Sequence, residues 1–288
     1  MNDLSVIINN EAPAKASSAV WCNVTAIVTL VGCDAAQQVA ETLESVFSQT
    51  SPPDQLVIVV DHTVLHEQDA VIKRYSIDKR VPLVDVLSIK GRADLASAMN
   101  AGLALCKGDW VMCVAGGDVC HPERLAIQLD YVARHPDVDV FGSWWETPTV
   151  KGTRIATCGV HQSAIVNALR WSNVLLHSSL LVRASVLHEI GGYSPRFADL
   201  ADYDLVIRLA TNNTRFRIIP AVLVAIEAQR RHLWCDLRFR FACWRSGLLT
   251  FRQYVMVTLV SLAKQLTNRP SRPASRIIRW IAQPTGQA

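Results

Sequence analysis

Short apolar runs alternate along the chain with longer stretches in which apolar residues recur at helical spacing. The β-branched run 23–31 ends in Gly32 and predicts a strand, and the spacing of apolar residues in 35–48 predicts a helix. The same alternation continues, and it predicts strands at 55–60, 81–89, 110–114 and 138–141 and helices at 67–75, 94–106 and 122–134.

This order of elements predicts an α/β fold with a mostly parallel sheet flanked by helices. Continuous apolar strands are typical of a sheet that is covered on both faces. Ligands of such sheets bind beyond the carboxyl ends of the strands. We therefore look for function in the segments that follow the strands, which are 32–34, 61–63, 91–94 and 115–118.

The second half of this domain, residues 142–229, is less regular. His177 opens an apolar run that ends at Val182, and 201–210 predicts a helix with two acids in its first turn. We expect three parts in the chain: a flexible N-terminal arm at 1–23, one α/β domain at 24–227 and a basic amphipathic helical extension at 228–288.

Composition and cysteine usage narrow the class of protein. Half of the 288 residues are hydrophobic and 19% are charged, which excludes a disordered or low-complexity chain. Eight scattered cysteines form no C-x-x-C pair, so they predict neither a zinc knuckle nor a disulfide framework. Asp3 and Glu11 near the start do not fit a secretory signal. We expect a protein of the reducing cytoplasm.

Charge is distributed unevenly, although the net charge is only +4. The segment 228–288 holds eleven Arg or Lys and one acid, Asp236, so it carries about +10 and the body about −6. Its longest apolar run, 254–263, is half the length that a bilayer crossing needs. We expect peripheral contact with a membrane, anchored by Trp234, Trp244 and Trp280. The alternative is a pair of solvated helices packed on the body. We expect no nucleic-acid binding, because no recognition motif accompanies the charge.

Four segments, in this order and spacing, resemble the inverting family 2 glycosyltransferases, which have the GT-A fold. They are LVGCDAAQQVAETLESVFSQT (30–50), QLVIVVDHT (55–63), ASAMNAGLALCKGDWVMCVAGGDVCHPERL (96–125) and HSSLLVRASVLHEIGGYSPRFADLADYDLVIRLA (177–210). The resemblance implies transfer of a sugar from a nucleotide sugar to a saccharide or lipid-linked acceptor, with inversion. Family members of this size often build surface polysaccharides on a lipid carrier, which would place the chain at the inner face of the plasma membrane.

Inversion is a single displacement that needs a base for the acceptor hydroxyl. The resemblance implies Asp202 as this base, because it matches the second residue of the family's Glu-Asp pair. The alternative is that Asp202 only caps its helix.

The residues that would stabilise the departing diphosphate differ from the family's pattern. The family's Asp-x-Asp pair holds Mg²⁺ or Mn²⁺, but Ala115 and Gly117 occupy these positions and only Asp118 remains. Three readings stay open: Asp118 holds the metal nearly alone, cationic side chains and backbone amides replace the metal, or activity has been lost. The Gly116–Gly117 pair either exposes amides to phosphate or simply makes a tight turn. The rival function is therefore a catalytically impaired nucleotide-sugar-binding or scaffold protein.

The resemblance also implies residues that contact the donor. Asp61 matches the strand end that contacts the nucleotide base, and a carboxylate accepts from the imide of uracil, so UDP is the expected nucleotide. Arg92 and Asn100 match positions near the nucleotide. The alternatives are a solvated strand-end acid at Asp61 and structural roles for the other two.

On the acceptor side, His177 matches the family's histidine, and Trp144 with Trp145 would form a stacking platform for a sugar. A satisfied core histidine and core tryptophans are the alternatives.

Overall fold

The computed structural model describes most of the chain between residues 23 and 267. The described residues are 23–30, 35–91, 93–149, 152–169, 173–226, 237, 240, 241, 243, 244 and 249–267. Nearly all of the arm at 1–23 and most of the basic extension therefore lie outside the described residues, and the division into three parts stays a prediction.

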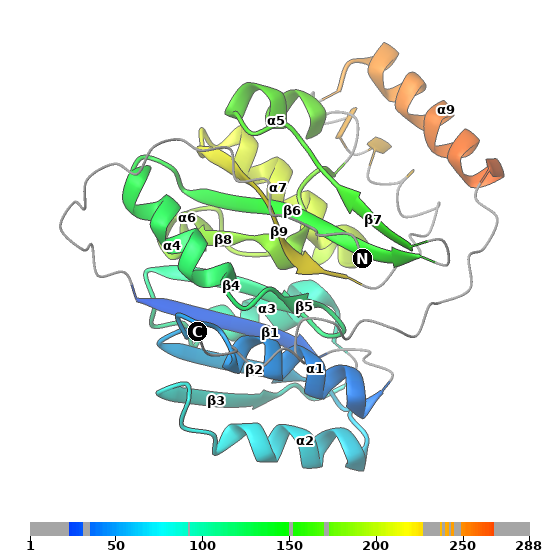
Figure 1. Cartoon of the computed structure of the whole chain (residues 1–288). Helices are drawn as coiled ribbons and strands as arrows, with labels where there is room; N and C mark the ends of the chain where they lie inside the picture. Colours follow the sequence, from blue (N-terminus) through cyan, green and yellow to red (C-terminus); the bar gives the residue numbers. More distant parts are fainter. Residues whose placement is uncertain are drawn as a thin grey trace.

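The first half is the parallel sheet that the apolar pattern predicts, with the strand order β3-β2-β1-β4. Its strands are β1 (Val24–Leu30), β2 (Gln55–Val60), β3 (Leu83–Ser88) and β4 (Trp110–Ala115). The connecting helices are α1 (Ala36–Phe47), α2 (His66–Ser76) and α3 (Leu95–Leu103). Leu30 lies opposite Val60, and Thr29 opposite Ala115, so the carboxyl ends of the central strands meet at one edge (Figure 1).

The second half makes the sheet mixed rather than mostly parallel. β8 (Leu181–Arg183) runs antiparallel to β4, and β6 (Val140–Thr149) runs antiparallel to β8. β9 (Phe216–Ala225) runs parallel to β6, and its end pairs with the short β5 (Val119–Cys120), which follows β4 in the chain. β7 (Gly152–Ala156) forms a hairpin with β6.

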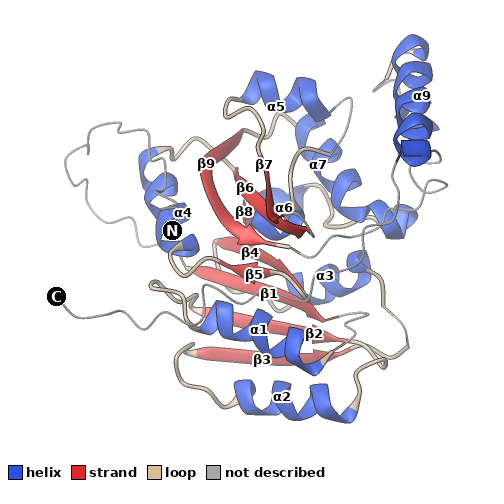
Figure 2. Ribbon diagram, turned by 45° about the vertical axis from the view of Figure 1, so that its right-hand side comes forward, coloured by secondary structure: helices blue, strands red, loops and turns tan. Residues whose placement is uncertain are grey.

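The remaining helices cover the sheet and connect these strands. They are α4 (Arg124–Arg134), α5 (Gln162–Leu169), the 3₁₀ turn η1 (His177–Ser179), α6 (Ala184–Glu189), the 3₁₀ segment η2 (Pro195–Leu200), α7 (Ala201–Thr211) and α9 (Phe251–Thr267). Figure 2 shows the strands as a layer with helices on both sides.

Two hydrophobic clusters correspond to the two faces of the sheet. In β1, Ala26 and Val28 belong to the cluster under α1, α2 and α4, whereas Ile27 between them belongs to the cluster under α3, α6 and α7. This alternation is the period of two of a strand, and the burial of both faces explains why the strand reads as a continuous apolar run.

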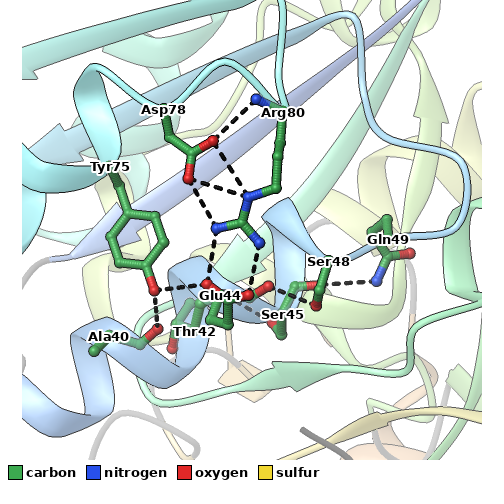
Figure 3. Close-up of polar contacts among 9 residues, drawn as sticks. All are labelled: Ala40, Thr42, Glu44, Ser45, Ser48, Gln49, Tyr75, Asp78 and Arg80. Carbon is green, nitrogen blue, oxygen red and sulfur yellow. Dashed lines mark hydrogen bonds and ion pairs between the residues drawn. The ribbon is translucent and has the colours of Figure 1, made fainter. Parts of the chain in front are cut away.

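A surface network fixes α1 against the turn that precedes β3 (Figure 3). Arg80 makes two bonds of 2.7 and 2.9 Å to the carboxylate of Glu44 and also pairs with Asp78, while the hydroxyl of Tyr75 donates to Glu44 at 2.9 Å. The hydrogen bond from Arg80 lowers the pKa of Glu44 despite its partial burial. Since the pairs are half-exposed, their contribution to stability is on the order of 1 kcal/mol.

Among the described helices, none combines the length and apolar character needed to cross a bilayer.

Candidate active site

Asp61 lies directly after β2 and is buried at the carboxyl edge of the sheet. Its Oδ1 accepts from the amide of Thr63 at 2.9 Å and from the Thr63 hydroxyl, and its Oδ2 accepts from the amide of Ala93 at 3.0 Å. Burial raises the pKa of Asp61, but these donors and nearby His62 outweigh it and hold the pKa below its ordinary value. Asp61 is therefore a charged group that ties the end of β2 to the loop before α3, and not a solvated strand-end acid.

Asp118 lies in the turn between β4 and β5 and is only 4% exposed. The hydroxyl of Ser178 donates to its Oδ2 and accepts from the amide of Ala115 at 3.1 Å. Ser178 therefore fixes the carboxylate against the end of β4.

The glycines before Asp118 form a tight turn and do not offer their amides to a phosphate. The amide of Gly116 donates to the carbonyl of Thr29 at 2.9 Å, and the amide of Gly117 donates to the hydroxyl of Thr42 at 3.0 Å. Gly117 has φ of +86°, in the left-handed region that favours glycine. The reading of this pair as a phosphate nest is wrong, because both donors are used inside the protein.

The inner face of α1 holds the whole segment 116–125 in place. Besides Thr42, Ser45 accepts from the amide of Cys120 at 3.1 Å. Gln49 donates to the carbonyl of His121 at 2.7 Å and accepts from the amide of Leu125 at 2.9 Å. The S-x-x-x-Q-T pattern at the end of α1 is thus the docking site for the loop that carries Asp118.

The described residues do not fit the divalent cation that the GT-A fold implies. No group of three or more His, Cys, Asp or Glu side chains comes together among them. Ala115 and Gly117 offer no ligand side chain, and the remaining carboxylate of Asp118 is buried and bonded to Ser178. A single carboxylate that already accepts a hydrogen bond inside the protein is a poor set of ligands for Mg²⁺ or Mn²⁺. The mechanism proposed below therefore contains no step on a metal.

The 3₁₀ turn η1 places Ser178 beside Asp118 and places His177, the preceding residue, in a second polar cluster. His177 is 6% exposed, and its Nε2 lies 2.9 Å from the hydroxyl of Tyr193. The same hydroxyl lies 3.7 Å from the sulfur of Cys113 in β4. The Nδ1 of His177 has no hydrogen-bond partner among the residues that the structure describes.

Asp202 lies in the first turn of α7, and its carboxylate does not cap the helix. The cap residue is Leu200 without a side-chain cap bond, and the Oδ2 of Asp202 accepts from the side-chain amide of Asn173 at 2.9 Å. The next acid in the helix, Asp204, pairs with Arg208 at 2.7 Å. Asn173 therefore orients the carboxylate toward the segment before η1.

Electrostatics connects Asp202 to this second cluster. Burial lowers the pKa of His177 to about 4, the charge of Asp202 acts to raise it, and that of Arg124 acts to lower it. Burial also raises the pKa of Tyr193 well above its ordinary value, and Asp202 adds to this rise. At neutral pH we therefore expect a neutral histidine and a neutral tyrosine in this cluster.

Asn100 has a role different from the predicted nucleotide contact. Its amide donates to the carbonyl of Tyr193 at 2.7 Å and accepts from the Tyr193 amide at 2.8 Å. Gly191 and Gly192 both have positive φ, and a Cβ on Gly192 would come within 2.5 Å of the Asn100 Oδ1. Asn100 thus fixes the Gly-Gly-Tyr segment that contains Tyr193. Both polar atoms of its side chain are used in these bonds, so we do not propose it as a contact to the nucleotide sugar.

The remaining predicted residues lie elsewhere. Trp144 and Trp145 are inside β6 rather than after it, because pairing with β7 and a bulge against β9 prolong this strand beyond residue 141. The ring nitrogen of Trp144 donates to the carbonyl of Cys158 at 3.4 Å, and the ring packs against the core. Arg92 lies outside the described residues, so its role stays a prediction.

The structure brings Asp118, His177 and Asp202 into one region, and their roles in catalysis or binding stay predictions. Sequence reasoning misses the side chains that hold them. Two of these side chains could have been found from the sequence. Ser178 directly follows His177, and Tyr193 follows a Gly-Gly pair that predicts an unusual turn. Asn173 carries no signal, since it lies in an irregular segment whose path the sequence does not define.

Known proteins share both the sequence pattern and the architecture. A sequence model described as "Glycosyl transferase family 2" matches residues 25–176, more than half of the chain. The amylovoran biosynthesis glycosyltransferase AmsE of Erwinia amylovora is 25% identical over 253 residues, which cover 84% of this chain and 92% of that protein. A UDP-Gal:alpha-D-GlcNAc-diphosphoundecaprenol beta-1,3-galactosyltransferase of Escherichia coli is 22% identical over 230 residues, or 75% of this chain and 82% of that protein.

Solved structures agree on the fold. TarS of S. aureus in complex with UDP superposes with a TM-score of 0.63 at 14% identity, covering 85% of this chain and 72% of that one. The mannosyltransferase PcManGT of Pyrobaculum calidifontis, in complex with GDP-Man and Mn²⁺, gives a TM-score of 0.55 at 17% identity, covering 91% and 70%. With a GT-A-like sheet, its motif segments at the expected strand ends and a family match over half its length, the chain belongs to glycosyl transferase family 2.

Proposed function

We propose that the protein is an inverting glycosyltransferase that moves a sugar from a nucleotide sugar to a saccharide or lipid-linked acceptor. The observation that carries the proposal is the 3₁₀ turn η1, which joins the two halves of the site. Ser178 bonds the carboxylate after β4, and the adjacent His177 interacts with the carboxylate at the start of α7. The strand end with Asp118 alone would offer only a binding site for the donor. In the proposed arrangement, Asp202 supplies a base next to that site.

In the proposed reaction, Asp202 takes the proton of the acceptor hydroxyl as its oxygen attacks the anomeric carbon. The bond between that carbon and the diphosphate oxygen breaks on the opposite face, and the nucleoside diphosphate leaves with the electron pair. Asn173 orients Asp202 for this step. Because burial keeps His177 neutral, no imidazolium cation lies beside the base to weaken its affinity for the proton.

UDP is the favoured nucleotide of the proposed donor. Asp61 is ionised at the carboxyl edge of the sheet. Its Oδ1 accepts two bonds from Thr63, whereas its Oδ2 accepts only from the amide of Ala93 among the bonds described above and has a second lone pair. In the proposal, Oδ2 accepts from the imide of uracil. Two facts about similar proteins support this choice: TarS was solved with UDP and with UDP-GlcNAc, and the Escherichia coli relative is named for UDP-Gal.

We place the reaction in surface polysaccharide biosynthesis, at the cytoplasmic face of the plasma membrane. AmsE is named for amylovoran biosynthesis, RfbC of Myxococcus xanthus for O-antigen biosynthesis, and the Escherichia coli relative for a diphosphoundecaprenol acceptor. A lipid-linked acceptor is confined to the membrane, which requires the enzyme to work at its surface.

The second candidate function is a catalytically impaired nucleotide-sugar-binding or scaffold protein. One observation favours it, which is that Ala115 and Gly117 replace the aspartates of the family and leave a single buried acid, Asp118. This protein would bind a donor without transferring its sugar.

The deciding experiment compares the wild-type protein with Asp202→Asn, using UDP-sugars and GDP-sugars and membrane extracts as the source of acceptor. We expect the wild type to release nucleoside diphosphate and Asp202→Asn to lose at least about a hundredfold in rate. A donor at a hundred times its Kd should add about 2.7 kcal/mol to the free energy of unfolding of both proteins.

Each assay is repeated with Mg²⁺, with Mn²⁺ and with chelator. Donor binding without turnover in the wild type would establish the scaffold reading. A variant as active as the wild type would remove Asp202 from the mechanism, and a rate that depends on metal would show that Asp118 recruits a cation after all.

A further inference from the structure

Among the described side chains of α9, Phe251, Tyr254 and Val257 contact the rest of the protein, and the ring of Phe251 lies 5.6 Å from that of Trp244. Val257 is buried in the hydrophobic cluster that contains α3 and α7. Tyr254 stacks on Trp244 with ring centroids 5.5 Å apart, and Trp244 itself packs against the same cluster. The helix therefore has a defined inner face and, opposite to it, an outer face.

The outer face of α9 is apolar, which is the reverse of what a surface helix normally presents to water. Phe251, Val255 and Leu259 follow each other at a spacing of four, with exposed fractions of 61%, 37% and 60%, and Met256 beside them is 56% exposed. Residues at this spacing form one continuous stripe. We call these four residues the α9 stripe. Contiguous apolar surface of this kind marks a contact with a partner or a membrane.

The charge of the sequence that contains the α9 stripe indicates the kind of partner. Residues 237–288 contain nine Arg or Lys and no acid; Arg240 among them is buried, and Arg252 is exposed beside the stripe itself. An apolar stripe flanked by basic residues is complementary to an anionic lipid surface, which offers acyl chains below a layer of phosphates. A second copy of the chain would instead bring two such basic segments together, and like charges oppose that contact.

We propose that the α9 stripe is a docking surface for an anionic membrane, on which α9 lies parallel to the bilayer plane. The helix, about 25 Å long, does not span the bilayer, in keeping with the absence of a membrane-spanning helix among the described residues. The stripe enters the boundary between headgroups and acyl chains, and Arg252 contacts lipid phosphates. This contact goes beyond the proposed sugar transfer and does not depend on it.

Of the predicted membrane anchors Trp234, Trp244 and Trp280, only Trp244 lies among the described residues, and it packs against the core and Tyr254. Trp234 and Trp280 stay predictions. In the proposal, the exposed apolar side chains of α9 take the role of Trp244.

The test measures co-sedimentation of the full chain with lipid vesicles, without nucleotide sugar or acceptor, so that its outcome is independent of enzymatic activity. The vesicles are phosphatidylcholine alone or phosphatidylcholine with about 30 mol% phosphatidylglycerol. We expect wild-type protein to bind the anionic vesicles and to release them as NaCl is raised. Met256→Gln/Leu259→Gln should lower the partition coefficient at least about tenfold.

The matched control is Leu65→Gln/Ile77→Gln, which removes two exposed apolar side chains flanking α2, at the opposite end of the molecule (Figure 1). It should bind as the wild type does. Circular dichroism must show equal unfolding temperatures; should the double variant unfold, Leu259→Glu alone repeats the test.

Three results would overturn the proposal. They are no binding to anionic vesicles, equal binding by Met256→Gln/Leu259→Gln, and binding to neutral vesicles that matches binding to anionic ones. A wild type that is dimeric by light scattering, with a monomeric stripe variant, would assign the stripe to a second copy. Stripe-dependent capture of an acidic protein with no vesicle binding would assign it to a protein partner.

Discussion

At the scale of single residues, Asn173 determines how the carboxylate of Asp202 is oriented. Asn173→Ala removes the amide that donates to Oδ2 at 2.9 Å. We expect kcat to fall about tenfold while KM for the donor stays within twofold, because the base is still present but less well aligned. Steady-state kinetics with a fixed acceptor measures both constants.

The control for Asn173→Ala is Asn167→Ala, an exposed position in α5 that should leave both constants unchanged. If Asn173→Ala lowers only the melting temperature and leaves kcat intact, its bond to Asp202 is structural and the assigned role is wrong.

The sequence predicts the principal residues of the site better than the partners that hold them. Asp61, Asp118 and Asp202 are singled out because they match motif positions of the family that the chain resembles, and their roles stay predictions. Ser178 and Asn173 are not, since their bonds depend on how irregular segments fold back on the sheet. For Asn100, the sequence suggests a nucleotide contact, but in the structure its side chain is hydrogen-bonded to the backbone of Tyr193, 93 positions away.

At the scale of elements, the junction of α3 with the Gly-Gly-Tyr segment offers a test of packing. Gly191 and Gly192 have nearly equal φ values of +73° and +70°, but only at Gly192 would a Cβ meet an atom within 4 Å, the Oδ1 of Asn100 at 2.5 Å. Gly191→Ala should cost about 1 kcal/mol in unfolding free energy from backbone strain alone. Gly192→Ala should cost at least about 1 kcal/mol more, since it also disrupts the Asn100 bonds.

Urea denaturation of both variants measures this difference, and Gly191→Ala serves as the control for strain. Equal losses in the two variants would show that Asn100 moves aside without cost. They would also show that the Asn100 bonds to Tyr193 do not fix the segment.

The sequence predicts elements well where a strand is buried on both faces and poorly where pairing alone defines it. The strands β1, β2 and β4 are found within two residues, because their apolar runs are continuous and buried. The edge strand β3 is also found within two residues, although it is only partly buried and contains Asp85. β6 runs to residue 149 although its outer part is polar, because it pairs with β7. The local sequence does not predict this pairing.

At the scale of the whole molecule, His177 makes stability depend on pH. In the folded protein its pKa is about 4, whereas an unfolded chain has the ordinary value of 6.5. Below pH 6.5 the unfolded state takes up a proton that the folded state refuses, so the contribution of His177 to stability is lost as pH falls from about 6.5 to about 4. The loss should total a few kcal/mol.

His177→Gln removes this dependence. Urea denaturation at pH 7.5 and pH 5 should show a smaller loss of unfolding free energy in the variant than in the wild type. Other groups titrate in both proteins, so the difference between the two is the quantity to compare. An identical loss in both would mean that His177 is protonated inside the fold.

The join between the two halves of the sheet is the part of the architecture that the sequence does not reveal. The fully buried guanidinium of Arg124 donates to the carbonyl of Cys113 at the end of β4 and to that of Leu180 before β8. A charged residue at a helix start reads as a surface position, and only the tertiary fold shows that it links parallel to antiparallel strands.

The bonds from Thr42, Ser45 and Gln49 to the segment 116–125 have one more consequence. They hold the segment that carries Asp118 in one conformation, with the amides of Gly117, Cys120 and Leu125 already bonded inside the protein. We therefore expect any motion that admits a substrate or frees a product to come from other parts of the molecule, while this segment keeps its shape throughout the cycle.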